Sequence, residues 1–367
     1  MTLRLGVVGA GDVALRDYLP ELPRLGNRIE LTAVAARTEE RARAAAERFG
    51  ARRWTTGYRE LVAADDVDAI LNLTPFTLHV EVTLAALEAG KHVYSEKPLA
   101  PTVAEADRIF AAADERGLTV VAAPSVLLFP QVQRALELVR SGALGAIHSA
   151  RGRGLGGIPP WEGYISDPSP YFAEPGGPLA DMAVYPLHAL TGLLGPVRRV
   201  AALSARTRSS FTVAEGRFQG LHVPVEVDDQ WQLLVELEGG CLVSVEASNA
   251  ADHALAPELE LLGEAGALGL SLLDVAQPLR IAAADGVREE HVPHERESGP
   301  DHLLGVEHLV DCVERGTPPL VGIEHARHVI EVLEAARRSA RSGTTQSMTS
   351  SFPRATAAEP EVTARGG

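Results

Sequence analysis

The sequence predicts an α/β fold in two parts, an N-terminal doubly wound parallel sheet and a C-terminal α+β domain with a large, mostly antiparallel sheet. From residue 1 to about 125, short β-branched runs alternate with helix-period stretches rich in Ala, Leu, Glu and Arg, a pattern typical of βαβ units. After residue 145, longer alternating runs are joined by turn pairs, as in antiparallel sheets. The 367 residues also exceed one typical domain of about 100 to 200 residues.

The N-terminal part is expected to hold five parallel strands. They are the apolar runs at residues 3–8, 31–36, 69–73, 92–95 and 119–122. Gly50, Gly90 and Gly117 each follow a helix-period stretch, at the place where a left-handed residue commonly ends a helix. Thr102 and Glu105 have the spacing of a capping box, which predicts a helix start.

The C-terminal part, residues 126–342, is expected to form a strand meander followed by two helices. Gly239 and Gly240 lie between two alternating runs, and such a pair tolerates the positive φ angles of a hairpin turn. The expected strands are residues 231–238, 241–248, 259–262, 268–272, 279–283 and 289–292, and the expected helices are residues 303–314 and 325–342. Residues 343–367 are rich in Ser, Thr, Pro, Ala and Gly without an apolar period, so we expect a disordered tail.

Composition and charge exclude several classes of protein. The 34 basic and 49 acidic residues give a net charge of −15, which repels phosphate backbones, so we expect no nucleic-acid partner. There is neither an apolar segment of about 18 residues nor a signal-like N-terminus, so we expect no membrane span and no export. Cys241 and Cys312 have the spacing of neither a zinc site nor a disulfide framework, so we expect no metal and a reducing, cytoplasmic location.

A glycine-rich loop follows the first expected strand. Gly9, Gly11 and Ala14 match the pattern G-x-G-x-x-A, with Asp12 and Val13 between them, and the match opens a helix-period stretch. The glycines permit a tight turn and let the backbone approach a pyrophosphate at the helix N-terminus, while a small residue permits close helix–strand packing. This arrangement indicates a dinucleotide site, and the alternative is a tight turn without a ligand.

The end of the second expected strand predicts which dinucleotide binds. An Asp or Glu there would accept a hydrogen bond from the ribose 2′-hydroxyl and repel a 2′-phosphate. This chain instead has Ala36 and Arg37, followed by Thr38 with its hydroxyl. A guanidinium in place of a carboxylate favours NADP, with NAD also possible, and predicts an NADP-binding domain at residues 1–125. The alternative is that Arg37 is a solvated surface charge.

Two further segments carry the candidate catalytic groups. Glu96 and Lys97 follow the fourth expected strand, at the carboxyl edge where open α/β sheets bind ligands. Asp181, Tyr185 and His188 lie at positions i, i+4 and i+7 of a stretch that follows a Gly/Pro turn, so we expect them to share one helix face. Their neighbours are apolar, so a solvated surface does not explain them, whereas a buried Asp-Tyr-His hydrogen-bond network would.

Together these segments resemble the family of glucose-fructose oxidoreductase, inositol dehydrogenase and their relatives (Gfo/Idh/MocA). The resemblance covers residues from about 3 to 342 and rests on the glycine loop, Thr74 and Pro75 with His79, and the segments 88–93, 96–98 and 176–182. It implies an N-terminal Rossmann domain and a C-terminal domain that binds substrate on one sheet face and often oligomerises through the other. The cofactor contacts that it implies are Thr74, Pro75, His79, Glu96 and Lys97.

The resemblance also implies roles for the catalytic candidates. Lys97 would orient and polarise the substrate oxygen beside the nicotinamide, and Asp181 would bind the substrate or brace a neighbour. The position of Tyr185 carries the proton-transfer residue, which is His or Tyr in the family. A tyrosine, with an ordinary pKa of about 10, would act near neutrality only if Lys97 and the nicotinamide cation stabilise its phenolate. His188 is a competing base or a relay.

The chain departs from the family pattern at three places. Phe76 stands where the family commonly has Asn, the segment 127–130 replaces a frequent Arg-Phe-x-Pro, and Ala183 replaces a usual Gly. We therefore expect a more apolar substrate pocket. Four aromatic residues of the Gly/Pro-rich segment 152–178 would form a lid over the substrate or pack as the core of their own loop; they are Trp161, Tyr164, Tyr171 and Phe172.

These observations predict an NAD(P)-dependent oxidoreductase that moves hydride between nicotinamide and a sugar, a cyclitol or a related small alcohol or carbonyl compound. The alternatives are a glycosidase that uses transient oxidation by bound NAD, and a dinucleotide-sensing regulator without turnover. Because a large apolar sheet face rarely stays in water, we also expect a homodimer or homotetramer.

Overall fold

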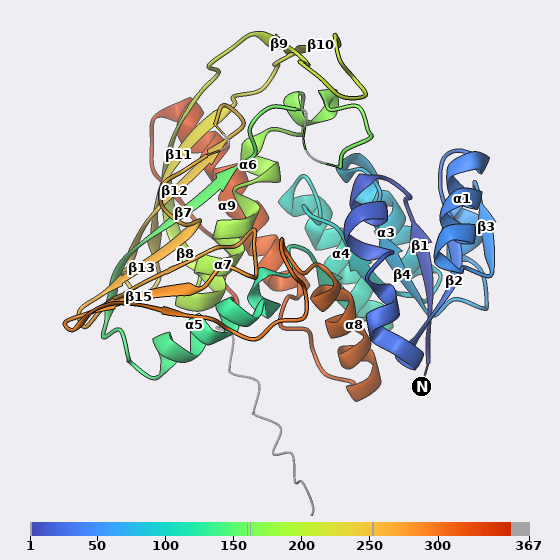
Figure 1. The fold of residues 1–367 in the computed structure, drawn as a ribbon, viewed down its shortest axis with the longest axis horizontal. Coiled ribbons are helices and arrows are strands. Elements are labelled where there is room, and N and C mark those ends of the chain that lie inside the picture. The colour runs from blue at the N-terminus through green and yellow to red at the C-terminus, as the bar shows by residue number, and fades with distance from the viewer. Residues whose placement is uncertain (1, 160, 162, 252, 354–367) are drawn as a thin grey trace, which may run out of the picture.

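A computed structural model describes residues 2–159, 161, 163–251 and 253–353. It contains a six-stranded sheet and a nine-stranded sheet with helices between them, and a short two-stranded sheet formed by β9 (Ser210–Thr212) and β10 (His222–Pro224) (Figure 1). The predicted two-part α/β architecture is confirmed. No helix in the described part of the chain is long and apolar enough to span a bilayer.

The N-terminal sheet is parallel throughout and has the strand order β3-β2-β1-β4-β5-β6. The order reverses between β1 and β4, which creates the crevice where doubly wound sheets bind ligands. The strands are β1 (Leu3–Val8), β2 (Ile29–Ala35), β3 (Arg53–Thr55), β4 (Ala69–Asn72), β5 (His92–Ser95) and β6 (Val120–Ala122). The sequence pattern does not reveal β3, because three residues, two of them polar, carry no apolar period.

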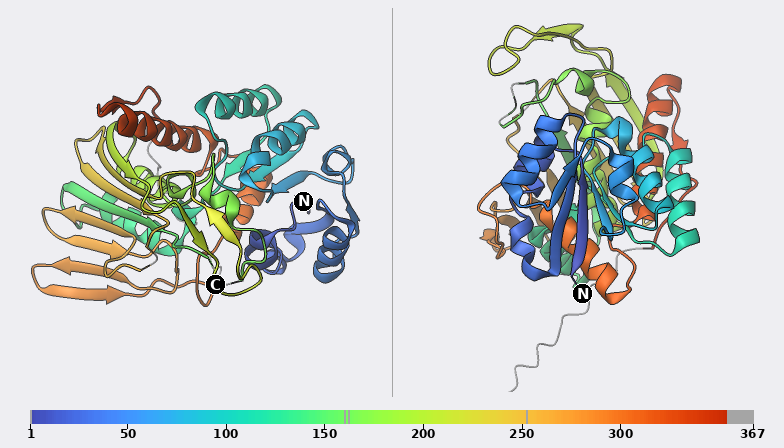
Figure 2. Two further views of the ribbon diagram at one scale, coloured as in Figure 1. Left: turned by 90° about the horizontal axis from the view of Figure 1, so that it is seen from above. Right: turned by 90° about the vertical axis from the view of Figure 1, so that its right-hand side faces the viewer.

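Helices cover both faces of this sheet (Figure 2). Those between its strands are α1 (Glu39–Phe49), α2 (Tyr58–Val62), α3 (His79–Glu88) and α4 (Val103–Arg116). The predicted helix ends are confirmed, since Gly50, Gly90 and Gly117 have φ angles of 75°, 75° and 62°. The predicted N-cap is confirmed as well, because Thr102 Oγ1 accepts a hydrogen bond from the N–H of Glu105.

The C-terminal sheet has the order β16-β15-β14-β13-β7-β12-β11-β8-β17 and is mostly antiparallel, as predicted, with one parallel pair, β7 and β12. The predicted hairpin joins β11 to β12, and Gly240 in its turn has a φ of 83°. The strands are β7 (Ile147–Leu155), β8 (Val197–Ala205), β11 (Gln230–Leu237), β12 (Leu242–Ser248), β13 (Leu259–Gly263), β14 (Ala267–Leu270), β15 (Leu279–Ala283), β16 (Gly286–Glu290) and β17 (Gln346–Ser347).

One face of this sheet carries the helices that separate it from the N-terminal sheet (Figure 1). They are α5 (Pro130–Arg140), α6 (Pro178–Asp181), α7 (Val184–Leu194) and α9 (Ile323–Ser342). None of the helices that the structure describes covers the opposite face (Figures 1 and 2). The site at the carboxyl edge of the N-terminal sheet therefore faces the helix-covered side of the C-terminal sheet.

The last two helices return to the N-terminal sheet. The first of them, α8 (Leu303–Arg315), packs so closely on β5 and β6 that a Cβ on Gly305 would lie 2.0 Å from Ser125 Oγ and 2.5 Å from the Tyr94 ring. The connection to α9 adds a backbone hydrogen bond of 3.1 Å from the N–H of Ala122 to the carbonyl of Val321. The core of the N-terminal part thus contains residues from the C-terminal end of the chain.

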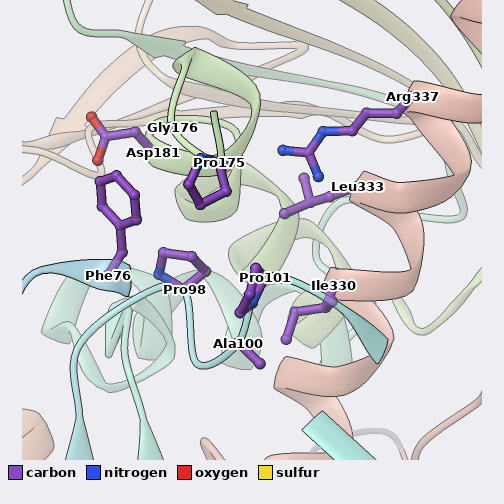
Figure 3. Close-up of a pocket in the computed structure, with 11 residues that line it drawn as sticks. Phe76, Pro98, Ala100, Pro101, Pro175, Gly176, Asp181, Ile330, Leu333 and Arg337 are labelled. Carbon is purple, nitrogen blue, oxygen red and sulfur yellow. The ribbon is translucent and has the colours of Figure 1, made fainter. Parts of the chain in front are cut away.

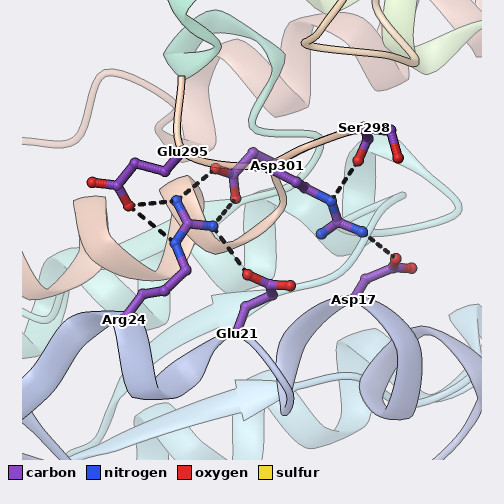
Figure 4. A network of polar contacts seen from close by, with 7 residues as sticks. Asp17, Glu21, Arg24, Glu295, Ser298 and Asp301 are labelled. Carbon is purple, nitrogen blue, oxygen red and sulfur yellow. Dashed lines mark hydrogen bonds and ion pairs between the residues drawn. The ribbon is translucent and has the colours of Figure 1, made fainter. Parts of the chain in front are cut away.

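The segment before α8 also crosses the residues that follow the glycine loop. Those residues form a π-helical turn (Ala14–Tyr18) and a 3₁₀ segment (Leu22–Arg28) instead of one regular α-helix. Arg24 makes ion pairs with Asp301 and Glu295 at 2.9 and 3.0 Å, and Arg296 lies 3.4 Å from Asp17 (Figure 4). These contacts tie the C-terminal segment to the start of the dinucleotide domain.

The prediction of a disordered tail at residues 343–367 is wrong for the described residues 343–353. Strand β17 pairs with β8, and the carboxylate of Glu331 accepts hydrogen bonds from the N–H groups of Thr349 and Ser350 at 2.6 and 2.9 Å. Phe352 then stacks on His325 with 4.3 Å between ring centroids. The buried acceptor on α9 lies far away in sequence, so the composition of the tail does not reveal these contacts. Residues 354–367 lie outside the described residues.

Candidate active site

The two glycines of the loop after β1 serve different purposes. Gly9 has a φ of 106°, and a Cβ there would lie 2.4 Å from the carbonyl oxygen of Leu73. The close approach of these two backbone segments therefore requires glycine even without a ligand. At Gly11, a Cβ would meet no protein atom within 4 Å. The open backbone at Gly11 is thus free for a ligand, which fits a pyrophosphate approaching the predicted cofactor loop.

Asp12, expected to contact the cofactor, uses its carboxylate elsewhere. Its side chain is 8% exposed, and its two oxygens accept hydrogen bonds from the N–H groups of Ile165 and Ser166 at 2.6 and 3.1 Å. Next to this contact, the guanidinium of Arg16 lies over the ring of Tyr164, 4.6 Å from its centroid. Asp12 therefore joins the glycine loop to the segment at 164–166, and the neighbouring Val13 is partly buried.

Arg37 and Thr38 follow β2 and are exposed, and Ala36 is partly buried. Thr38 caps α1, because its hydroxyl oxygen accepts a bond from the N–H of Arg41 at 3.4 Å. Within the described residues Arg37 has no ion pair and no side-chain hydrogen bond, so its guanidinium is available for an anion.

His79 lies inside the protein, between two predicted cofactor loops. It is 1% exposed, and its ring nitrogens contact the carbonyl oxygens of Thr74 and Pro98 at 2.8 and 2.7 Å. A residue that sequence reasoning missed, Asn72, accepts hydrogen bonds from Thr74 and donates one to the carbonyl of His79. His79 is thus placed to hold the Thr74–Pro75 loop against the loop after Lys97, and Pro75 is the exposed member of that loop.

Glu96 is a buried acceptor behind the catalytic candidates. It is 7% exposed, and it accepts hydrogen bonds from the Tyr18 hydroxyl at 2.5 Å and from the N–H of Lys97 at 2.9 Å. The hydroxyls of Tyr18 and Tyr94 are 2.8 Å apart and continue this network. Glu96 therefore holds the backbone of Lys97 in place.

Lys97 and Asp181 come together from opposite halves of the chain. Lys97 Nζ donates to Asp181 Oδ1 at 2.5 Å and to the carbonyl oxygen of Asp181 at 2.9 Å, and it lies 4.9 Å from the centroid of the Tyr185 ring. Burial alone would lower the pKa of Lys97, but the field of Asp181, reinforced by Tyr185 and Glu96, outweighs burial and raises it well above its usual value. The site therefore contains a fixed ammonium group.

The pKa of Tyr185 is raised, which differs from the expectation that Lys97 lowers it. Burial is the largest cause of the increase, and the opposing effect of Lys97 is smaller. A neutral phenol beside an ammonium group can donate a proton, which suits an acid in carbonyl reduction.

The expected single helix with Asp181, Tyr185 and His188 on one face is wrong. Asp181 ends α6, and α7 begins after Met182 and Ala183. Pro186 lacks the N–H that would bond to the carbonyl of Met182, four residues earlier, so a regular α-helix is kinked or broken here. Pro186 was the sequence signal for the break.

His188 lies apart from Lys97. Its Nδ1–H donates to the carbonyl of Val184 at 2.8 Å, its ring lies 4.9 Å from that of His325, and its buried Nε2 has no partner in the described part of the chain. Burial lowers its pKa to about 4. None of its described contacts is with Lys97, Asp181 or Tyr185.

The four aromatic residues of the segment 152–178 pack against one another and against β9 and β10. Trp161 lies 5.2 Å from both Tyr164 and Tyr171 and stacks parallel to Phe172 at 6.1 Å. Phe172 is fully buried in a small core with valines of the β9–β10 region, so the interpretation as the core of its own loop is confirmed. Tyr171 also lies 6.4 Å from Phe76, which brings this cluster to the catalytic edge.

A cleft begins at Asp181 (Figure 3). Its walls are mostly apolar and are formed by Phe76, Pro98, Ala100, Pro101, Pro175, Gly176, Ala180, Ile330, Leu333 and Arg337. The segment 127–130 does not contribute to it, since Leu127 and Phe129 are 2% and 0% exposed in the core. Ala183 is buried as well.

Comparison with known proteins identifies the family. The model of the "Oxidoreductase family, NAD-binding Rossmann fold" matches residues 3–123, and that of the "GFO/IDH/MocA C-terminal domain" matches residues 132–269. The dTDP-3,4-didehydro-2,6-dideoxy-alpha-D-glucose 3-reductase of Streptomyces violaceoruber is 35% identical over 299 residues, 79% of this chain and 80% of that protein. The chain belongs to the Gfo/Idh/MocA family.

Other Gfo/Idh/MocA proteins are similar over large parts of the chain. The levoglucosan dehydrogenase of Pseudarthrobacter phenanthrenivorans is 30% identical over 233 residues, 59% of this chain and 58% of that protein. The crystal structure of a 3-ketoreductase from Actinomadura kijaniata with NADP and TDP-benzene has a TM-score of 0.77 at 28% identity, and covers 92% of this chain and 98% of its own.

As a Gfo/Idh/MocA protein, the chain is an NAD(P)-dependent oxidoreductase with an N-terminal Rossmann domain. The predictions of family, fold class, enzyme class and dinucleotide cofactor are thereby confirmed. The roles of individual site residues stay predictions, and the variants described below test them.

Proposed function

We propose that the enzyme transfers hydride between a nicotinamide dinucleotide and a secondary alcohol or carbonyl carbon of a carbohydrate. The observation that carries this proposal is the contact of Lys97 with Asp181 and Tyr185 at the carboxyl edge of the Rossmann sheet. When bound, the dinucleotide supplies or accepts the hydride at C4 of its nicotinamide ring. The open backbone at Gly11 and the free guanidinium of Arg37 would hold its phosphates.

The side chains divide the remaining work. Lys97 holds the substrate oxygen and stabilises negative charge that develops on it, and Asp181 fixes the direction of the ammonium group. In reduction, the neutral phenol of Tyr185 donates a proton to the substrate oxygen, and in oxidation its phenolate form accepts the proton of the substrate hydroxyl. Glu96 and His79 position the loops and do not touch the reacting atoms.

A carbohydrate substrate is supported by the names of the relatives. One specifies a dTDP-linked deoxyglucose and another specifies levoglucosan. The test is incubation of the purified enzyme with NADP⁺ and a panel of sugars, polyols and cyclitols while reduced nicotinamide is followed by its absorbance. Dinucleotide binding without turnover on any compound would favour a regulator, and sugar release from a glycoside without net change in nicotinamide would favour a glycosidase.

The preference for NADP(H) is tested at Arg37. Substituting Arg37 by Ala should weaken NADP(H) binding by about 1.5 to 3 kcal/mol, the usual contribution of a hydrogen bond to a charged group, and leave NAD(H) nearly unchanged. Titration of both reduced cofactors by fluorescence measures the difference. Arg41, on the neighbouring helix turn, provides the matched control Arg41→Ala, and equal losses for both cofactors would refute the assignment.

The role of Tyr185 as the proton donor is tested by the pH dependence of kcat. Because burial raises the pKa of Tyr185, its phenol stays protonated at neutral pH, and kcat for reduction should be constant from about pH 6 to pH 9. An acid with the pKa of His188, about 4, would instead be deprotonated throughout this range. A tenfold fall of kcat with each pH unit would therefore contradict the role of Tyr185.

We also propose that the enzyme is a homodimer or homotetramer formed through the uncovered face of the C-terminal sheet. Leu203, Leu234 and Leu242 lie on neighbouring strands and are 75%, 68% and 61% exposed. Covering such side chains removes apolar surface from water. Light scattering should give a multiple of 38.9 kDa, and replacing Leu203 and Leu234 by Glu should lower it to 38.9 kDa. A wild-type species of 38.9 kDa at micromolar concentration would count against this assembly.

The two cysteines support a cytoplasmic location, which we include in the proposal. Cys241 and Cys312 are free and buried, and burial raises the pKa of both thiols. Protonated, buried thiols are inert and suit a reducing compartment.

A further inference from the structure

Arg337 is a guanidinium without a partner at the far end of the cleft that begins at Asp181. It projects from α9 toward Pro175, while Asp181 and Phe76 lie at the opposite end (Figure 3). A second cleft meets the first at Gly176 and Arg337. The side chain thus lies where two cavities join.

The charge of Arg337 is not neutralised by direct contact. It is partly buried, and among the described residues it forms no ion pair and no hydrogen bond. Glu334 is engaged elsewhere, with the N–H of Val103 at 3.0 Å and with Arg338 at 3.5 Å, and Glu174 is exposed. Burial lowers the pKa of Arg337 and the fields of these carboxylates raise it, with burial the larger effect. A guanidinium nevertheless stays charged at neutral pH.

The rest of the cleft cannot balance this cation. Between Asp181 and Arg337 its walls are side chains of proline, alanine, leucine and isoleucine, together with Gly176. A charge removed from water without a partner is costly, and a ligand that brings the opposite charge recovers part of that cost. Asp181 is not that partner, because its carboxylate binds Lys97.

We propose that Arg337 binds an oxyanion group of the substrate, so that the enzyme acts on carbohydrates that carry a carboxylate or phosphoryl group. This rests on the proposed function, because it places the reacting carbon at Lys97 and Tyr185 and the anionic substituent along the cleft. A planar guanidinium binds both kinds of oxyanion through two parallel N–H groups. The apolar walls of the cleft accommodate the part of the molecule that joins the two ends.

The test measures binding and not turnover. The full chain is titrated by calorimetry, without added dinucleotide, with D-glucose, D-glucuronate, D-glucose 1-phosphate and TDP-glucose. At least one anionic probe should bind about 10- to 100-fold more tightly than glucose, as expected for hydrogen bonds between charged groups. The probe with the largest preference distinguishes a carboxylate, a phosphate monoester and a nucleotide diphosphate as the source of the oxyanion.

Three variants locate the preference. Arg337→Gln should abolish it, and Arg337→Lys should retain part of it. Arg338→Gln, on the exposed side of the same helix turn, should keep it and serves as the matched control. The proposal is overturned if no anionic probe is preferred, if the preference survives in Arg337→Gln, or if Arg338→Gln reduces it equally. An oxyanion preference without nicotinamide-linked turnover of any anionic or neutral carbohydrate would instead overturn the proposed function and keep the binding site.

Discussion

Substituting Lys97 by Met is expected to lower turnover by about 10²- to 10⁴-fold, or about 3 to 5 kcal/mol. The substitution removes the ammonium group that would hold the substrate oxygen, and it leaves the carboxylate of Asp181 without its partner at 2.5 Å. Cofactor affinity should barely change. Steady-state kinetics and a dinucleotide titration on the same preparation measure the two effects.

Lys97 and Tyr185 are expected to act as one unit. Tyr185→Phe should cost a factor comparable to that of Lys97→Met while preserving the fold, and the double variant should be little worse than either single one. His188→Ala is the comparison, because His188 contacts Val184 and His325 and not Lys97. Loss of activity in His188→Ala together with retention in Tyr185→Phe would assign the proton to His188. Retention of activity in all of these variants would show that the side chains have a structural role, and it would favour the dinucleotide-sensing regulator.

Ending the chain at residue 343 should lower the free energy of unfolding by about 3 kcal/mol or more relative to a chain that ends at residue 353. Glu331 is 5% exposed and accepts three hydrogen bonds from Thr349 and Ser350. Without them its carboxylate is a buried charge whose nearest cation, on Arg327, is 4.0 Å away. Urea unfolding followed by circular dichroism measures the difference.

A charge-neutral variant separates this effect from simple shortening. Glu331→Gln should destabilise the chain that ends at residue 353 and have a smaller effect in the chain that ends at residue 343, because the lost hydrogen bonds are then already absent. Equal effects of Glu331→Gln in the two chains would show that the segment is stabilised by other contacts, such as the ring of Phe352 on His325.

Five of the six Rossmann strands and the position of the cofactor loop could be predicted because their signals are local. Each of these five strands is an apolar run of its own, and Gly9 and Gly11 follow β1 directly. The same holds for Lys97, which follows a strand whose carboxyl end meets the others at one edge of the sheet. Periodicity and turn chemistry are therefore sufficient to predict the fold class, the cofactor loop and the position of Lys97.

The other features of the site depend on contacts between distant segments. No local pattern places the carboxylate of Asp12 against the backbone of Ile165, or shows that burial outweighs Lys97 at Tyr185. From the sequence alone, Arg337 is one of several charged residues on an amphipathic helix. Its position at the cleft follows only from the packing of α9 beside the Rossmann sheet. The break between α6 and α7 could have been predicted from the sequence, because Pro186 cannot donate a hydrogen bond to the carbonyl of Met182.

The return of α8 and α9 to the Rossmann sheet has a consequence for synthesis of the protein. The N-terminal half leaves the ribosome first, but its core needs Gly305 against Tyr94 and Ile323 and Ile330 beside α4. Domains made of one continuous segment can fold as they emerge, in order from the N-terminus. Here the dinucleotide domain can be completed only after almost the whole chain has been translated, so its first strands must stay unaggregated for most of that time.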